Sequence, residues 1–77
     1  MKFPNKLFSY NESVISKFSV FLEIIGNKPI SVGDLYIKVS DYVSDVSEFI
    51  EVLDALYALN KIDYDKNQGV LVYADAI

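Results

Sequence analysis

The order of apolar and polar residues along the chain predicts three helices followed by a hairpin. Ser9 and Glu12 are spaced as a capping box, which marks a helix start. Apolar residues then recur at about 3.6-residue spacing over residues 10–25. They form one stripe: Val14, Ile15, Phe18, Phe21, Leu22 and Ile25. Gly26 and Asn27 follow, and either can take positive φ, so we expect the first helix to end there.

A second helix is predicted to start at Ser31, because Asp34 stands three residues later as in a weaker capping box. Its helical period continues to about Tyr42. One face of this helix is apolar: Val32, Leu35, Tyr36, Val39, Tyr42 and Val43.

A third helix should begin at Ser44 or Asp45 and run over about residues 46–59, since Glu48 stands three residues after Asp45. Its apolar positions cover a wide arc: Phe49, Ile50, Val52, Leu53, Leu56, Tyr57 and Leu59. Asn60 suits a left-handed cap at its end. The short connection between the second and third helices is typical of a helix-turn-helix.

After the third helix the apolar period changes to two, which predicts strands. Ile62 and Tyr64 alternate with Asp63, residues 65–69 form a turn, and residues 70–73 are β-rich. Because a two-stranded hairpin is marginal by itself, we expect it to pack on the helices.

These elements describe an α+β fold of the winged helix-turn-helix type, with three helices followed by a two-stranded hairpin wing. We expect one domain over residues 1–77, divided into an extended N-terminal segment at 1–8, three helices within 9–60, the wing at 61–73 and a tail at 74–77.

Two details of the hairpin are open to test. Tyr64 and Tyr73 occur in the two strands, where they can face one another as a cross-strand pair. An extended piece near Phe3, or one over residues 28–30, is available as a third strand.

Composition narrows the chemistry of this chain. Its 77 residues are 52% hydrophobic and 23% charged, which favours one small ordered domain. With no histidine and no cysteine, it has no imidazole base, thiolate, disulfide or ordinary zinc site, so we expect no enzyme activity, cofactor or metal. No apolar run approaches the ~18 residues of a membrane span, and no signal peptide is apparent, so we expect a cytoplasmic protein.

The net charge of −4 can be assigned to the third helix. Residues 45–60 hold Asp45, Glu48, Glu51 and Asp54 and no basic residue, while the rest of the chain balances. A DNA-recognition helix needs basic and amide side chains. The acidic helix therefore favours a protein partner, with Glu48, Glu51 and Asp54 as candidate contacts.

The alternative function is that of a small DNA-binding transcriptional regulator. Its candidate nucleic-acid contacts are Lys61 at the helix end and Lys66 with Asn67 and Gln68 at the wing tip. Two lysines neutralise few phosphates, so the charges argue against direct binding to nucleic acid.

Some apolar residues lie outside the predicted core stripes and are further candidates for partner binding. Three lie on the first and second helices: Val20, Ile24 and Ile37. Three precede the first helix and have no periodic face to join: Phe3, Phe8 and Tyr10. Ile50 and Tyr57 either add to such a patch or complete the core. The N-terminal segment, or Val20 with Ile24, could instead serve homodimerisation.

Four short stretches of the sequence carry a family resemblance: Phe3-Pro4-Asn5-Lys6, Ser9-Tyr10-Asn11-Glu12-Ser13, Ser16-Lys17-Phe18 and Leu56-Tyr57-Ala58-Leu59-Asn60-Lys61-Ile62. Together they resemble the small middle components of bacterial ABC-three-component systems. The resemblance implies a Lamassu-related antiviral defence system, in which a winged-helix adaptor binds a coiled-coil ABC ATPase subunit and an effector-bearing subunit. It brings no catalytic residues to this chain.

Overall fold

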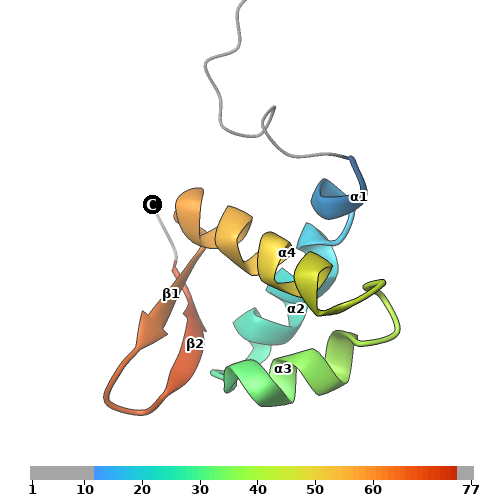
Figure 1. Ribbon diagram of the computed structural model, residues 1–77. Helices are drawn as coiled ribbons and strands as arrows, with labels where there is room; N and C mark the ends of the chain where they lie inside the picture. Colours follow the sequence, from blue (N-terminus) through green and yellow to red (C-terminus); the bar gives the residue numbers. More distant parts are fainter. Residues whose placement is uncertain (1–11, 75–77) are drawn as a thin grey trace, which may run out of the picture.

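The computed structural model describes residues 12–74, which form an α+β fold with an antiparallel two-stranded sheet beside a helical body (Figure 1). The elements are α1 (Glu12–Ile15), α2 (Phe18–Asn27), α3 (Val32–Val39), α4 (Val46–Ala58), β1 (Ile62–Asp65) and β2 (Val70–Tyr73). None of the described helices has the length and apolar character needed to cross a membrane. The predicted Ser9 cap and the candidates Phe3, Phe8 and Tyr10 lie outside the described residues.

The first predicted helix is divided, so the prediction of one continuous helix was wrong. α1 stops at Ile15, and the Ser13 carbonyl accepts hydrogen bonds from the Ser16 hydroxyl (2.9 Å) and the Lys17 ammonium (3.1 Å). The Lys17 amide donates instead to the carbonyl of Val14 at 3.1 Å. Side-chain donors thus compete for the carbonyl that a continuous helix would use, and the chain makes a turn before α2.

The end of α2 also differs from the prediction. The helix continues to Asn27, and neither Gly26 nor Asn27 takes positive φ. Lys28 is extended, with φ −167° and ψ 157°. A residue that precedes proline is disfavoured in the helical region, so Pro29 accounts for this stop.

α3 and α4 begin where the predicted capping residues place their starts. The Ser31 hydroxyl accepts the Asp34 amide proton at 3.1 Å, and the Asp45 carboxylate accepts that of Glu48 at 2.9 Å. α3 nevertheless ends at Val39, short of the predicted end, and the residue expected there, Tyr42, is 54% exposed.

The end of α4 confirms the left-handed cap. Asn60 has φ 62°, the Lys61 amide donates to the Leu56 carbonyl at 2.9 Å, and the Asn60 amide donates to that of Tyr57 at 3.0 Å. These two bonds make a Schellman motif, which turns the chain sharply from α4 into β1.

The hairpin has the predicted strands but not the predicted tyrosine pair. Tyr64 lies opposite Leu71, and Tyr73 lies opposite Ile62. The outward amide of Tyr64 is satisfied by the Asp63 carboxylate at 2.8 Å, which blunts the free edge of β1.

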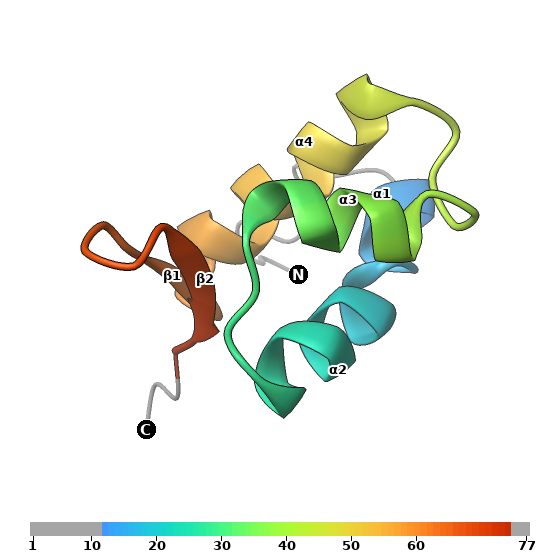
Figure 2. The same cartoon turned by 90° about the horizontal axis from the view of Figure 1, so that it is seen from below.

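The segment between α2 and α3 provides a third extended piece, as one of the two alternatives predicted. Ile30 forms an isolated bridge with Leu71 of β2, with N···O distances of 3.1 and 2.7 Å. The bridge holds the hairpin against the helical body, at the opposite end from the α3–α4 connection (Figure 2).

The core lies where the helices meet the inner face of the hairpin. Its buried residues are Val14, Phe21, Ile25, Ile30, Leu35, Val39, Val43, Phe49, Val52, Ala55, Leu56, Ile62 and Leu71. Phe49 of α4 packs on Phe21 and on the edge of Tyr36, with ring centroids 5.7 and 4.8 Å apart. Ile50 and Tyr57 do not complete this core, because they are 45% and 58% exposed.

Candidate partner-binding surfaces

The side of α4 that faces away from the core combines apolar and acidic residues. We call it the α4 outer face and define it by Val46, Ile50, Glu51, Asp54 and Tyr57, all exposed. At about 100° per residue, the three apolar residues fall within a narrow arc, Asp54 lies beside them, and Glu51 lies farther round the helix. In the described part of the chain, neither carboxylate has a hydrogen bond or an ion pair. This face is therefore available for contact.

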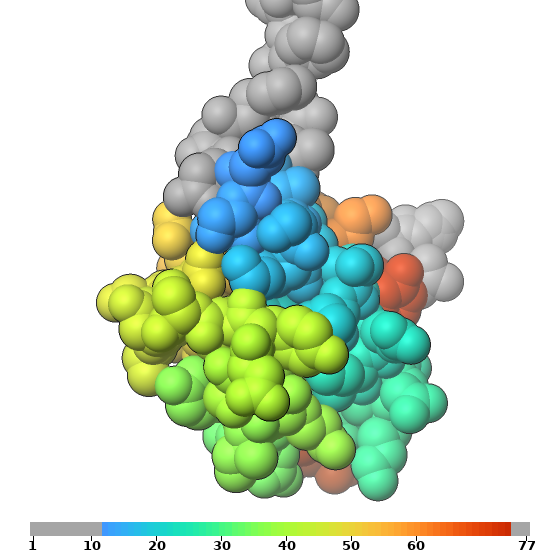
Figure 3. Space-filling view, turned by 90° about the vertical axis from the view of Figure 1, so that its right-hand side faces the viewer, coloured from blue at the N-terminus to red at the C-terminus, as the bar shows by residue number. Residues whose placement is uncertain are grey.

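Glu48 lies on the same helix but is half-buried and held by bonds to other parts of the chain. Its Oε2 accepts hydrogen bonds from the Ser13 hydroxyl and from the Lys17 ammonium at 3.5 Å, and its Oε1 accepts the Ser44 amide proton at 2.8 Å. The glutamate side chain is only 14% exposed. α1 packs against α4, and in Figure 3 the α1 residues, in blue, lie beside those of α4, in yellow.

These bonds change the acidity of Glu48. The Ser13 hydrogen bond is the largest cause, the Ser44 amide is the next, and the Lys17 charge adds to them, and together they lower the pKa of Glu48 to about 2. The carboxylate therefore ties α1 to α4, and its role as a partner contact stays a prediction.

The fold brings together two of the three apolar candidates on α2 and α3, Ile24 and Ile37, but not Val20. Val20 and Ile24 are half-buried and pack against the core. Ile37 is 71% exposed on α3. Ile24 and Ile37 line two adjoining hollows, whereas Val20 lines neither.

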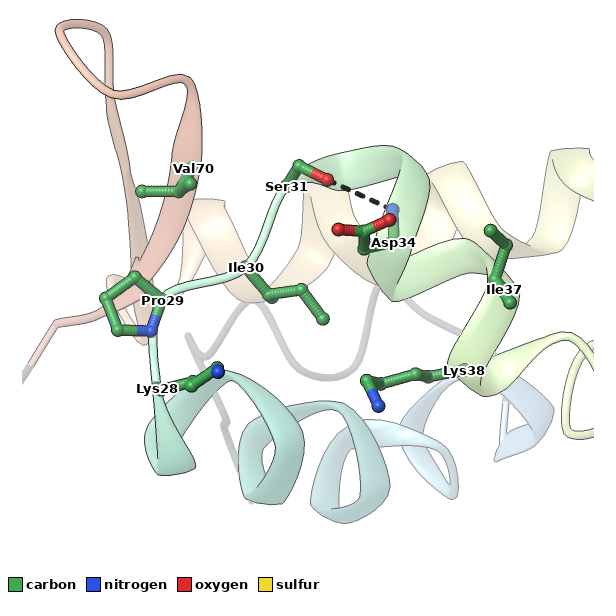
Figure 4. A pocket seen from close by; sticks show the side chains of 8 residues that line it. All are labelled: Lys28, Pro29, Ile30, Ser31, Asp34, Ile37, Lys38 and Val70. Atoms are coloured by element: carbon green, nitrogen blue, oxygen red, sulfur yellow. Dashed lines mark hydrogen bonds between the residues drawn. The ribbon is translucent and has the colours of Figure 1, made fainter.

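These hollows form a groove between the end of α2, α3 and β2, which we call the basic groove (Figure 4). The larger hollow has a volume of about 530 Å³ and the smaller one about 330 Å³. Its principal lining residues are Lys28, Pro29, Ile30, Ile37, Lys38 and Val70. Ser31 and Asp34 complete the larger hollow. Sequence reasoning missed the groove, because Lys28 and Lys38 meet only through the packing of α2 on α3.

The candidate nucleic-acid contacts do not form one basic surface. Lys61 precedes β1 and Lys66 follows it, so a strand of four residues, about 13 Å long, separates them. Asn67 lies in the turn, where its backbone N–H donates to the Asp65 carboxylate at 3.0 Å. Asp63 also lies on this hairpin, and its negative charge weakens the attraction of the hairpin for phosphates. Within residues 12–74 no group of three or more acidic, histidine or cysteine side chains could hold a metal ion.

Comparison of the sequence with known families assigns the protein to a class, the middle components of ABC-three-component systems. Residues 3–71 match the family model described as ABC-three component system Middle Component 7. The chain belongs to the Middle Component 7 family, which confirms the predicted resemblance to middle components, and the name of the system implies partner subunits. No curated protein and no solved structure matches the chain. The matched residues include both the α4 outer face and all the residues that line the basic groove.

Proposed function

We propose that this protein is a non-enzymatic adaptor of an antiviral defence complex, coupling a coiled-coil ABC ATPase subunit to an effector-bearing subunit through protein contacts. Membership of the middle-component family supports a role among several subunits. The observation that carries the proposal is the α4 outer face, where exposed apolar residues lie with two carboxylates that have no hydrogen bond or ion pair within residues 12–74.

We interpret the fold as a winged helix, and three features support that interpretation. A short connection joins α3 to α4, the hairpin follows α4 directly, and Ile30 bridges to Leu71 of the hairpin. In a helix-turn-helix the second helix of the pair reads DNA, and α4 has that place here. Its exposed acids repel phosphates, while a protein partner can bury its valine, isoleucine and tyrosine.

A pair of matched tyrosine variants tests this proposal. Tyr57 on the α4 outer face and Tyr73 on the hairpin are 58% and 50% exposed, so Tyr57→Ala and Tyr73→Ala remove similar surface. We expect the purified ATPase or effector subunit to bind the wild-type chain. Tyr57→Ala should weaken that binding by about 2 kcal/mol or more if it is a hot spot, and Tyr73→Ala should not. Isothermal titration calorimetry measures both.

Two outcomes would contradict the adaptor function. The first is failure of both subunits to bind the wild-type protein. The second is a low-salt mobility shift of duplex DNA that Lys61→Glu with Lys66→Glu abolishes, which would favour a DNA-binding regulator.

A further inference from the structure

We propose that the basic groove is a second docking site, which takes an acidic segment with an apolar side chain from a partner polypeptide. This inference rests on the proposed adaptor function in one respect, because it assigns the segment to another subunit of the same system. It adds a site on the other side of α3 from the α4 outer face.

The floor of the groove is apolar and fixed in place. Ile30 is 8% exposed, and its amide and carbonyl are both bonded to Leu71. Pro29 restricts the backbone beside it. Ile37 and Val70 extend this apolar lining on either side. A pocket that needs no rearrangement loses little free energy when it orders a ligand.

The charge at the groove differs in sign from that of the whole chain. Lys38 reaches from α3 toward α2, Lys28 lies at the end of α2, and the Ile30 side chain lies near both (Figure 4). Neither ammonium group forms an ion pair within residues 12–74, although Asp34 lines the same hollow. The groove thus carries a positive charge on a protein whose net charge is −4. Carboxylates of an incoming segment would complement the two lysines, while an apolar side chain would cover the floor.

The occupant is a polypeptide because of what surrounds the lysines. Two lysines neutralise few phosphates, Asp34 repels them, and an apolar floor contributes nothing to a phosphate backbone. The two adjoining hollows share Lys28, Ile30 and Lys38, which gives an elongated site suited to a short peptide segment.

The position of α3 lets the two surfaces act together. Tyr36 of α3 packs on Phe49 of α4, while Ile37 and Lys38, the next residues along, line the basic groove. α3 therefore separates the groove from α4. One adaptor can bind an acidic segment at the groove and a basic, apolar surface at the α4 outer face without competition between them.

Charge reversal at the groove tests the proposal. Lys28→Glu with Lys38→Glu should weaken binding of one purified subunit at least about 10-fold, and that affinity should fall as salt is raised in the wild type. The matched control is Lys61→Glu with Lys66→Glu, which makes the same change in charge on the hairpin. We expect less than about a 2-fold change from it. Circular dichroism checks that each variant is folded.

Photo-crosslinking identifies the occupant directly. A photoreactive amino acid at position 37 suits this purpose, because Ile37 is 71% exposed and its replacement leaves the core intact. In the assembled complex it should crosslink to a partner peptide that holds Asp or Glu beside an apolar residue. A crosslink to a basic peptide, to a second copy of this chain or to nucleic acid would overturn the proposal.

The two proposals fail in different ways. If the lysine reversals leave both subunits bound while Tyr57→Ala releases one, the groove is not a docking site and the adaptor function stands. If neither subunit binds the wild-type chain, the adaptor function itself is wrong.

Discussion

The two sides of α4 use the same residue types for different purposes. On the inner side, Leu56 and its buried neighbours meet α2 and α3, and Glu48 is surrounded by hydrogen-bond donors. On the outer face, Tyr57 and Ile50 remain exposed and Glu51 has no described partner. A single acidic helix therefore contains one carboxylate that supports the fold and others that are available to a partner. The number of acidic residues on a helix therefore indicates a binding surface only after those bonded within the molecule, such as Glu48, have been left out of the count.

The largest expected effect tests the inner side. Leu56→Ala should lower the free energy of unfolding by about 2–5 kcal/mol, because Leu56 is fully buried and its truncation leaves a cavity. Leu53→Ala on the same helix is the control, and it should cost less because Leu53 is half-buried. Urea denaturation measures both, and equal losses would show that the partial exposure of Leu53 does not reduce its contribution to the core.

A smaller effect separates Glu48 from Glu51. Glu48→Gln should lower stability at neutral pH, since it removes the charge that the Ser13, Ser44 and Lys17 donors favour. The matched Glu51→Gln should change the free energy of unfolding by less than about 0.5 kcal/mol, as expected at an exposed site.

The pH dependence of Glu48→Gln has a defined sign. The folded chain lowers the pKa of Glu48 from 4.5 to about 2, so the folded state keeps this carboxylate ionised at a pH where the unfolded chain takes up a proton. The stabilisation is complete above pH 4.5 and declines as pH falls toward 2. The stability gap between wild type and Glu48→Gln should narrow over that range. A constant gap would mean that the ionised carboxylate is not what joins α1 to α4.

The smallest effect on stability should come from the outer face. Glu51→Lys with Asp54→Lys should change the free energy of unfolding by less than about 1 kcal/mol in total, yet weaken partner binding severalfold. The control, Glu23→Lys with Asp41→Lys, makes the same charge change at exposed residues away from α4. Calorimetric titration of the partner subunits compares the two. Equal weakening by both variants would attribute the effect to net charge alone.

Local signals in the sequence were sufficient for several features of the fold. Ser31 and Asp45 cap the helices that follow them, Asn60 takes the left-handed conformation, and Gly69 takes positive φ in the turn of the hairpin. Each of these depends on residues within one turn of the chain. The family was also recognisable from short stretches of sequence.

Features that depend on distant residues could not be predicted. The break after Ile15 involves Ser13 and Lys17, which are also bonded to Glu48 on α4. The positions of the acidic residues in the sequence showed that the charge lies in one helix. They did not show that Glu48 is bonded to Ser13, Lys17 and Ser44 and is therefore less available on the surface of that helix. Likewise, Lys28 and Lys38 had no shared pattern until α2 and α3 packed together.

The bridge between Ile30 and Leu71 determines when, during synthesis of the protein, the basic groove can form. It joins the segment between α2 and α3 to β2, so the floor of the basic groove depends on a residue about 40 positions later in the sequence. A ribosome releases the helices before β2, and domains fold as units once their chain has emerged. The groove therefore forms only after Leu71 has left the ribosome, so docking at this site requires the hairpin as well as the helices to have emerged.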